Sequence, residues 1–368
     1  MRQSKTDVRS FLRPDVWARE PYEAPETVAA MAARLGLDAS SVLKLDQNEN
    51  PFGCSPKVNE ALARCERFHI YPDPLASECR AGIAEYAGAP FERVMAGNGA
   101  DELIEVLFRL FLRPGDNVLS FPPTFGYYAT VAGACLAEVR SVARQADWSI
   151  DVDAAIASID DRTRVIVVAS PNNPTGNITP VRDLERLADT GRLLIVDEAY
   201  FEFAGVTALP LALARENVVV LRTFSKWAGI AGLRAGYGVL PEWLVEQYLK
   251  LKPPYGMSIA AMIAVSASLA DRRYLLQTVE LLKRERERLI ERLRGLDFAS
   301  PWPSAANFVL VSLTRGDAES VRLGLERRGI LIRTYTNARL ARSIRISVGR
   351  PEQNDRVIAA LKEVGETL

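Results

Sequence analysis

Short runs of β-branched and other apolar residues recur along the chain between stretches with helical spacing. The clearest runs cover residues 117–121, 165–169, 193–196 and 218–221. Apolar runs of this length without a polar side are typical of strands that are buried on both faces. Their alternation with helices predicts an α/β fold in which helices flank a mostly parallel central sheet.

The pattern changes after about Ile259. Apolar residues keep helical spacing from Leu275 to Leu293, and Gly295 follows closely behind them. Because glycine is common just past the end of a helix, we expect one long helix that ends there. The alternating charges of residues 283–288 indicate the solvated face of this helix rather than a binding patch.

Two further apolar runs, residues 308–311 and 344–348, predict the strands of a second α/β segment. We therefore expect three parts along the chain. An N-terminal arm (residues 1–45) joins the small domain, a large domain covers residues 46–265, and the small domain is completed by residues 266–368.

Composition and charge narrow the functional classes. The 368 residues include 46 basic and 46 acidic side chains, so the chain lacks the positive charge that marks nucleic-acid binding. Its N-terminus is too charged for a signal peptide, and no apolar run reaches the roughly 18 residues of a membrane span. The cysteines and His69 show no metal-site spacing. We expect a cytoplasmic protein without metal, membrane or nucleic-acid partners.

Three polar motifs come directly after three of the predicted strands. They are SPNNPTG at 170–176, DEAY at 197–200 and TFSK at 223–226. Each motif alone has a simpler explanation, as a turn, a helix cap or a surface lysine. Ligands of open parallel sheets bind beyond the carboxyl ends of the strands, however, and all three motifs fall at such ends. Their coincidence favours a functional site.

The residue types in these motifs suit pyridoxal phosphate. The amine of Lys226 can form a Schiff base with an aldehyde, and Asp197 can pair with a protonated pyridine nitrogen. Two hydroxyls and a guanidinium near the lysine, those of Thr223, Ser225 and Arg234, can hold a phosphate. The stretch GNGADE at residues 97–102 precedes an apolar helical run and can present backbone N–H groups to the same anion.

With these residues, the chain resembles the fold-type I pyridoxal-phosphate aminotransferases. The strings that carry the resemblance are SPNNPTGN, IVDEAYFEF and RTFSKWAGIAGLRAGYG. Further strings are similar to the histidinol-phosphate aminotransferase family: RPDVWAREPYE, LDQNENPFG, YPDP, GNGADELIE, PPTFGYY and RISVGRPEQN. The similarity covers nearly the whole chain, and the motifs are specific as a set.

The resemblance implies roles for residues around the cofactor. Lys226 would carry pyridoxal 5'-phosphate and move the substrate proton, while Asp197 would pair with the pyridine nitrogen. Asn173 and Tyr200 would bind the ring oxygen. Phe125 would stack on the ring, although a core aromatic remains the alternative for it and for Tyr71. The residues expected at the phosphate are Gly99, Ala100, Asp101, Thr223, Ser225, Arg234 and Tyr71 from the neighbouring subunit of a homodimer.

The substrate residues implied by the resemblance are anion-binding ones. Arg345 would take a carboxylate or phosphate, Arg333 and Tyr22 would add contacts to the phosphate of histidinol phosphate, and Asn50 would also lie at the substrate. The expected reaction is transamination between L-histidinol phosphate and 2-oxoglutarate in histidine biosynthesis. An aromatic amino-acid aminotransferase, a threonine-phosphate decarboxylase and a sensor protein without turnover stay open as alternatives.

Overall fold

The computed structural model describes residues 7–19 and 26–368. The chain divides into two compact units, residues 1–42 and 43–368. The described part of the first unit contains α1 (Pro14–Trp17), α2 (Val28–Leu35) and the short 3-10 helices η1 (Val8–Phe11) and η2 (Ala39–Ser41). Tyr22, an expected substrate residue, lies outside the described residues.

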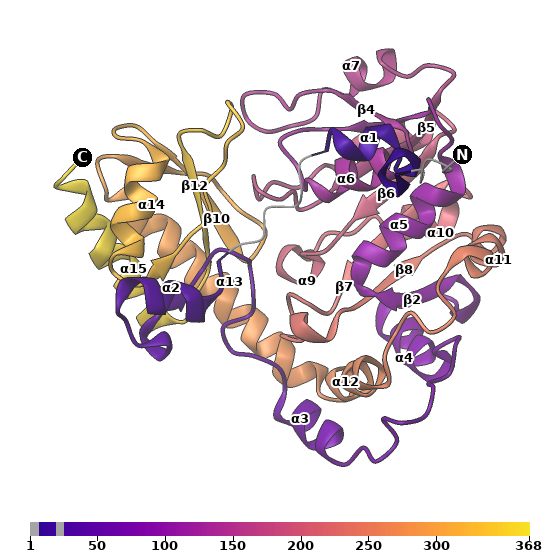
Figure 1. Cartoon of the computed structure of the whole chain (residues 1–368), viewed down its shortest axis with the longest axis horizontal. Helices are drawn as coiled ribbons and strands as arrows, with labels where there is room; N and C mark the ends of the chain where they lie inside the picture. Colours follow the sequence, from indigo (N-terminus) through magenta and orange to yellow (C-terminus); the bar gives the residue numbers. More distant parts are fainter. Residues whose placement is uncertain (1–6, 20–25) are drawn as a thin grey trace, which may run out of the picture. The chain divides into compact units, whose positions relative to one another are not determined.

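The second unit is built around a mixed sheet with strand order β2-β8-β7-β6-β5-β3-β4 (Figure 1). All neighbours from β7 to β4 run parallel, and β8 is antiparallel to both β2 and β7. The mostly parallel sheet predicted from the sequence is therefore confirmed. The strands are β2 (Val94–Asn98), β3 (Asn117–Ser120), β4 (Glu138–Ser141), β5 (Thr163–Ala169), β6 (Leu193–Asp197), β7 (Val218–Thr223) and β8 (Ala235–Val239).

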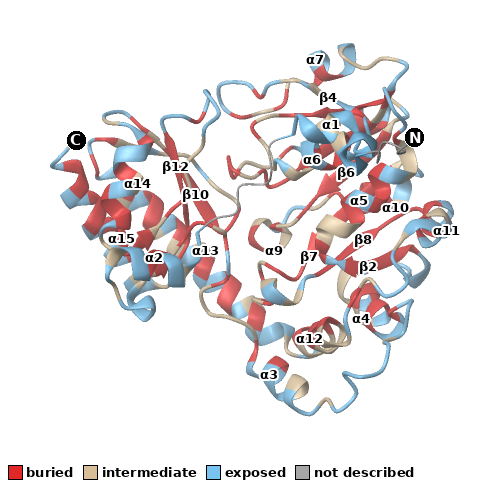
Figure 2. Ribbon diagram, viewed as in Figure 1, coloured by how far each residue is buried: buried red, intermediate tan, exposed pale blue. Residues whose placement is uncertain are grey.

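Helices cover both faces of this sheet, which explains the continuous apolar runs. In β6, Leu193 and Ile195 pack with α5 (Gly99–Phe111), α6 (Tyr127–Ala134) and α11 (Glu242–Leu251). Leu194 and Val196 point to the opposite face and pack with α7 (Val152–Ala157), α8 (Val181–Ala188) and α10 (Leu209–Ala214). Because side chains alternate between faces, both faces must be apolar. Figure 2 shows the resulting buried centre.

Smaller elements connect these layers. They are α3 (Pro56–Ala63), α4 (Ser77–Ala87), η3 (Phe91–Arg93), α9 (Phe201–Ala204), η4 (Ala231–Leu233) and α12 (Ile259–Ala270). The predicted division at residue 265 falls within α12, and the division into domains stays a prediction. No helix in the described ranges is long and apolar enough to cross a bilayer.

The long helix α13 (Arg272–Arg294) ends at Gly295 as expected. It packs against the C-terminal sheet, in which β10 (Phe308–Leu313) lies between β9 (Ala299–Pro301) and β12 (Ser343–Ser347). The helix α14 (Ala318–Glu326) packs against β12, and α15 (Pro351–Gly365) packs against α13 and α14. The strand β1 (Leu43–Lys44) pairs in parallel with β11 (Ile330–Leu331).

One detail of the helix prediction was wrong. Arg286 was expected on the solvated face of α13, but its side chain is buried. Its Nη1 donates a hydrogen bond to the carbonyl of Ala306, 3.1 Å away. An arginine with a backbone acceptor can be buried because the hydrogen bond offsets part of the loss of hydration.

Candidate active site

The three polar motifs meet at one edge of the central sheet. Strands β5, β6 and β7 are parallel neighbours, and the register pairs Ala169 with Asp197 and Asp197 with Leu221. The turns that follow these strands carry Asn173, Tyr200 and Lys226. The sequence-predicted amide, carboxylate, tyrosine and lysine are therefore brought to the same sheet edge.

Asp197 is a buried carboxylate with two donors. The hydroxyl of Tyr128 donates to Oδ2 at 2.6 Å, and the backbone N–H of Ala199 donates to Oδ1 at 3.0 Å. Burial outweighs these bonds and raises the pKa of Asp197 to about 6. Such a group favours a cationic partner, because a nearby positive charge would stabilise the ionised form.

Tyr128 is a site residue that the sequence reasoning missed. It lies in the PPTFGYY string, which drew attention to Phe125 instead. Phe125 is half-buried, and its ring meets that of Tyr128 edge to face with centroids 5.6 Å apart. Phe125 thus lies beside the tyrosine that holds Asp197, and its stacking role stays a prediction.

Lys226 has the environment of a nucleophilic amine. Its Nζ donates to the carbonyl of Gln47 at 3.1 Å. Burial lowers the pKa of Lys226 to about 8, and the positive charge of Arg345 adds to the effect. A larger fraction of the amine is then neutral near physiological pH, which is the form that attacks an aldehyde.

Two glycines allow a close backbone approach at the start of α5. A Cβ added to Gly236 in β8 would lie 2.4 Å from the backbone nitrogen of Ala100. A Cβ added to Gly99 would lie 2.7 Å from Nη2 of Arg234, and Gly99 has a φ of +79° that disfavours other residues. The glycines therefore bring the first N–H groups of α5 beside a guanidinium, an arrangement that suits a phosphate.

The polar side chains around this helix start are those expected at the phosphate. Arg234 Nη2 donates to Asp101 Oδ2 at 2.8 Å, and Nη1 lies 3.5 Å from Ser225 Oγ. The backbone N–H of Ser225 donates to Thr223 Oγ1 at 3.0 Å. Arg234 adopts a left-handed conformation, φ +53°, at the end of η4. The predicted phosphate residues of the loop and the helix thus converge.

Two arginines of the C-terminal part of the chain, Arg333 and Arg345, have their side chains on the same face. Arg333 and Arg345 form an antiparallel bridge, with backbone hydrogen bonds of 3.1 and 2.8 Å. Directly opposed residues point to the same face. Arg345 is buried and donates from Nη1 to Asn173 Oδ1 at 2.5 Å, whereas its Nε has no partner among the residues that the structure describes. The guanidinium of half-buried Arg333 makes no hydrogen bond or ion pair with the other described residues.

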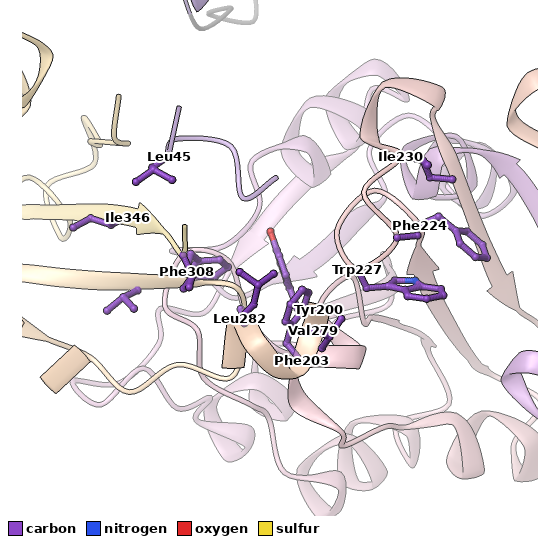
Figure 3. Packing of buried hydrophobic residues seen from close by; sticks show 14 of the residues in the cluster. Leu45, Tyr200, Phe203, Phe224, Trp227, Ile230, Val279, Leu282, Phe308 and Ile346 are labelled. Carbon is purple, nitrogen blue, oxygen red and sulfur yellow. The ribbon is translucent and has the colours of Figure 1, made fainter. Parts of the chain in front are cut away.

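Tyr200 connects this C-terminal part to the sheet edge. The ring is buried and meets Phe308 of β10 edge to face, with centroids 5.2 Å apart (Figure 3). Its hydroxyl accepts a hydrogen bond from Asn48 Nδ2 at 2.9 Å. Burial raises the pKa of Tyr200 to about 12, so the hydroxyl keeps its proton at neutral pH.

Two expected site residues make contacts of other kinds. Tyr71 is 77% exposed, and its ring stacks on Tyr255 with centroids 4.4 Å apart. The amide of Asn50 is occupied by backbone groups, because Nδ2 donates to the carbonyl of Trp227 and Oδ1 accepts from Phe52 N–H. Residues 7–19 and 26–368 contain no cluster of three potential metal ligands.

Comparisons with known proteins identify the family. Residues 40–361 match the family model for aminotransferase class I and II. The chain is 44% identical to a histidinol-phosphate aminotransferase of Roseiflexus castenholzii over 97% of this chain and 99% of the relative. A chloroplastic histidinol-phosphate aminotransferase of Nicotiana tabacum is 40% identical, with 96% and 86% coverage.

A solved structure agrees with these relatives. It is histidinol-phosphate aminotransferase from Sinorhizobium meliloti in complex with pyridoxal-5'-phosphate, with a TM-score of 0.87 and 27% identity over 97% of this chain and 98% of the other. The family, the fold and the enzyme class predicted from the sequence are confirmed. The chain belongs to the histidinol-phosphate aminotransferases within the class I and II aminotransferase family.

Proposed function

We propose that the protein transfers an amino group between L-histidinol phosphate and 2-oxoglutarate in histidine biosynthesis, with pyridoxal 5'-phosphate bound at Lys226. The observation that carries this proposal is the backbone bridge between Arg333 and Arg345, which places two arginine side chains on one face. A phosphate with close to two charges can use both groups. Relatives named histidinol-phosphate aminotransferase support the proposed reaction. The pyridoxal-5'-phosphate in the Sinorhizobium meliloti structure supports the proposed cofactor.

Pyridoxal phosphate, when bound, supplies an aldehyde that condenses with amines and a protonated pyridine ring that accepts electrons. Lys226 offers the aldehyde a larger fraction of neutral amine than an ordinary lysine does, because its pKa is lowered to about 8. The same Nζ would later accept and return the substrate proton. Asp197 would keep the pyridine nitrogen protonated, and Tyr128 and Ala199 hold its carboxylate in place.

The remaining cofactor contacts follow from the geometry of the loops. The N–H groups at the start of α5, the hydroxyls of Thr223 and Ser225 and the guanidinium of Arg234 would bind the phosphate. Asn173 and Tyr200 would bind the ring oxygen. Phe125 would cover one face of the ring and exclude water from it. The buried Asp197 and the close glycine backbone at Gly99 fit such a group, because they offer a charge partner and an N–H cradle.

Arg345 would orient the anionic group of every substrate. Its Nε is buried without a partner in the described part of the chain, so a bound carboxylate or phosphate would satisfy this donor. Arg333, together with Tyr22 and Asn50 as predicted from the sequence, would add contacts to the substrate. This division gives Arg345 a general role and Arg333 a role specific to phosphate.

We also propose that the active unit is a cytoplasmic homodimer. Tyr71 would reach the cofactor phosphate of the neighbouring subunit. Its exposure of 77% and its stacking on Tyr255 support the idea, because the stack holds an otherwise exposed ring available to a second copy.

A comparison of substrates tests the proposed reaction. The kcat/KM of the holoenzyme with 2-oxoglutarate would be measured for L-histidinol phosphate and for phenylalanine, and carbon dioxide release would be followed with L-threonine phosphate. We expect L-histidinol phosphate to be the best donor and no decarboxylation. A preference for phenylalanine would identify an aromatic aminotransferase, and release of carbon dioxide would identify a decarboxylase.

A further inference from the structure

Asn48 lies in the segment that follows β1, and its bonds connect three distant parts of the chain. Its side chain is buried, with 1% exposure. Its amide reaches Tyr200 after β6 and Ser347 at the end of β12. Its carbonyl accepts a hydrogen bond from Asn307 Nδ2 at 2.9 Å. None of the roles described above includes Asn48.

Hydrogen bonds around Asn48 connect Ser347 to Tyr200. The backbone N–H of Asn48 can only donate, and it donates to Ser347 Oγ at 2.8 Å. The Ser347 hydroxyl in turn donates to Asn48 Oδ1 at 3.0 Å. With the amide oxygen on Ser347, the Nδ2 group faces Tyr200.

The direction of the hydrogen bond between Asn48 and Tyr200 determines whether the Tyr200 hydroxyl proton is free to bind another acceptor. An amide nitrogen only donates, so the Tyr200 oxygen accepts from Asn48 at 2.9 Å. The hydroxyl proton of Tyr200 is then left for another acceptor. No acceptor for it occurs among the described residues of the protein. A buried donor without a partner is costly, and a bound ligand would remove that cost.

We propose that Asn48 is a positioning residue, which holds the Tyr200 hydroxyl as a hydrogen-bond donor toward the ring oxygen of the cofactor. The inference rests on the proposed function, because that function supplies the acceptor. The phenolic oxygen of pyridoxal phosphate is acidic, and an anionic oxygen binds a donor more strongly than a neutral one. The hydrogen bonds from Ser347 to Asn48 and from Asn48 to Tyr200 thus make the Tyr200 hydroxyl the donor in its contact with the cofactor.

The backbone at Asn48 allows clean substitutions. Its φ is +55°, in the left-handed region that glycine, asparagine and aspartate tolerate. Asn48→Gly removes the amide without backbone strain or added charge. Asn48→Asp replaces the donor with an acceptor that takes the Tyr200 proton. Asn307→Ala is the matched control, because it also removes a buried hydrogen bond to Asn48 but leaves the amide chain intact.

Two readouts other than turnover test the proposal. One is the affinity of apoprotein for pyridoxal phosphate, and the other is the pH midpoint of the visible band of the holoenzyme. Tyr200→Phe should weaken binding about ten- to a hundredfold, as expected for a hydrogen bond to a charged group. It should also raise the midpoint, because a ring oxygen without its donor holds a neighbouring proton more strongly.

The Asn48 variants should follow Tyr200→Phe. Asn48→Gly should weaken binding roughly three- to tenfold and raise the midpoint, and Asn48→Asp should approach the effect of Tyr200→Phe. In the Tyr200→Phe background, Asn48→Gly should add less than about twofold, because its effect passes through the missing hydroxyl. Asn307→Ala should lower the melting temperature of the apoprotein and leave the midpoint unchanged.

The outcomes separate this inference from the proposed function. Wild-type apoprotein that binds no pyridoxal phosphate would show that the proposed function is wrong, and the inference with it. If the wild type and Tyr200→Phe behave as expected, an unshifted midpoint in Asn48→Gly overturns the inference alone. An equal shift in both backgrounds would do the same, because Asn48 would then act independently of Tyr200.

Discussion

Replacing Asp197 with asparagine separates the role of this residue in catalysis from its effect on stability. Burial raises the pKa of Asp197 from 3.8 to about 6, which corresponds to about 3 kcal/mol. The folded protein thus holds this proton more tightly than the unfolded chain does. Its stability therefore falls as the pH rises from 3.8 through 6, and the whole loss is present above that range.

Asparagine at position 197 avoids this loss because it carries no charge. The new side chain can keep the bond from Ala199 N–H, and its Nδ2 can donate to the hydroxyl oxygen of Tyr128. The proton of Tyr128 then loses its acceptor, which offsets part of the gain. We expect Asp197→Asn apoprotein to be roughly 1–3 kcal/mol more stable than wild type at pH 7.5, with a smaller difference at pH 5.

The same change should abolish most of the activity. A neutral amide cannot stabilise a protonated pyridine, so the rate should fall by several orders of magnitude. Urea denaturation of the apoproteins at the two pH values measures stability, and steady-state kinetics measures the loss. Asp153→Asn serves as the control, since its carboxylate is 84% exposed and should change neither quantity much. An Asp197→Asn variant that is less stable at pH 7.5, or within about tenfold of wild-type activity, would refute this reasoning.

Three further predictions concern the lysine, the arginines and the assembly. Lys226→Ala should lose the visible band and stay inactive without an added amine; a normal rate would exclude Lys226 as the base. Arg333→Ala should lower kcat/KM for histidinol phosphate about ten- to a hundredfold more than for phenylalanine, whereas Arg345→Ala should lower both. Equal losses in Arg333→Ala would make Arg333 structural. Sedimentation should give a dimer, and a fully active monomer would contradict the role of Tyr71.

The parts of the fold that are predictable from sequence are those with a local signal. Strands β5, β6 and β7 are buried on both faces, so their apolar runs are continuous. The strand β8 was not predicted, because its sequence AGYGV contains two glycines, which are unfavourable in strands. Those glycines are needed for a tertiary reason: a Cβ at Gly236 or Gly238 would clash with its neighbours.

The residues of the candidate site also differ in whether a local signal in the sequence indicated them. Asp197 and Lys226 stand directly after strands, so their position in the sequence indicated the sheet edge. Tyr128 and Asn48 reach the site from segments far along the chain, 69 residues from Asp197 and 152 from Tyr200. Their importance depends on hydrogen bonds that form only in the folded protein. Both residues lie in strings that carry the family resemblance, LDQNENPFG and PPTFGYY, but residue type and spacing did not distinguish them from their neighbours there.

The most direct test of the account is a single half-reaction. Holoenzyme would be mixed with L-histidinol phosphate in the absence of 2-oxoglutarate, while its visible spectrum and the release of imidazole-acetol phosphate are followed. The account predicts loss of the visible band with one product per active site, recovery of the band on addition of 2-oxoglutarate, and no release of product by Lys226→Ala. An unchanged wild-type spectrum at saturating L-histidinol phosphate would contradict it.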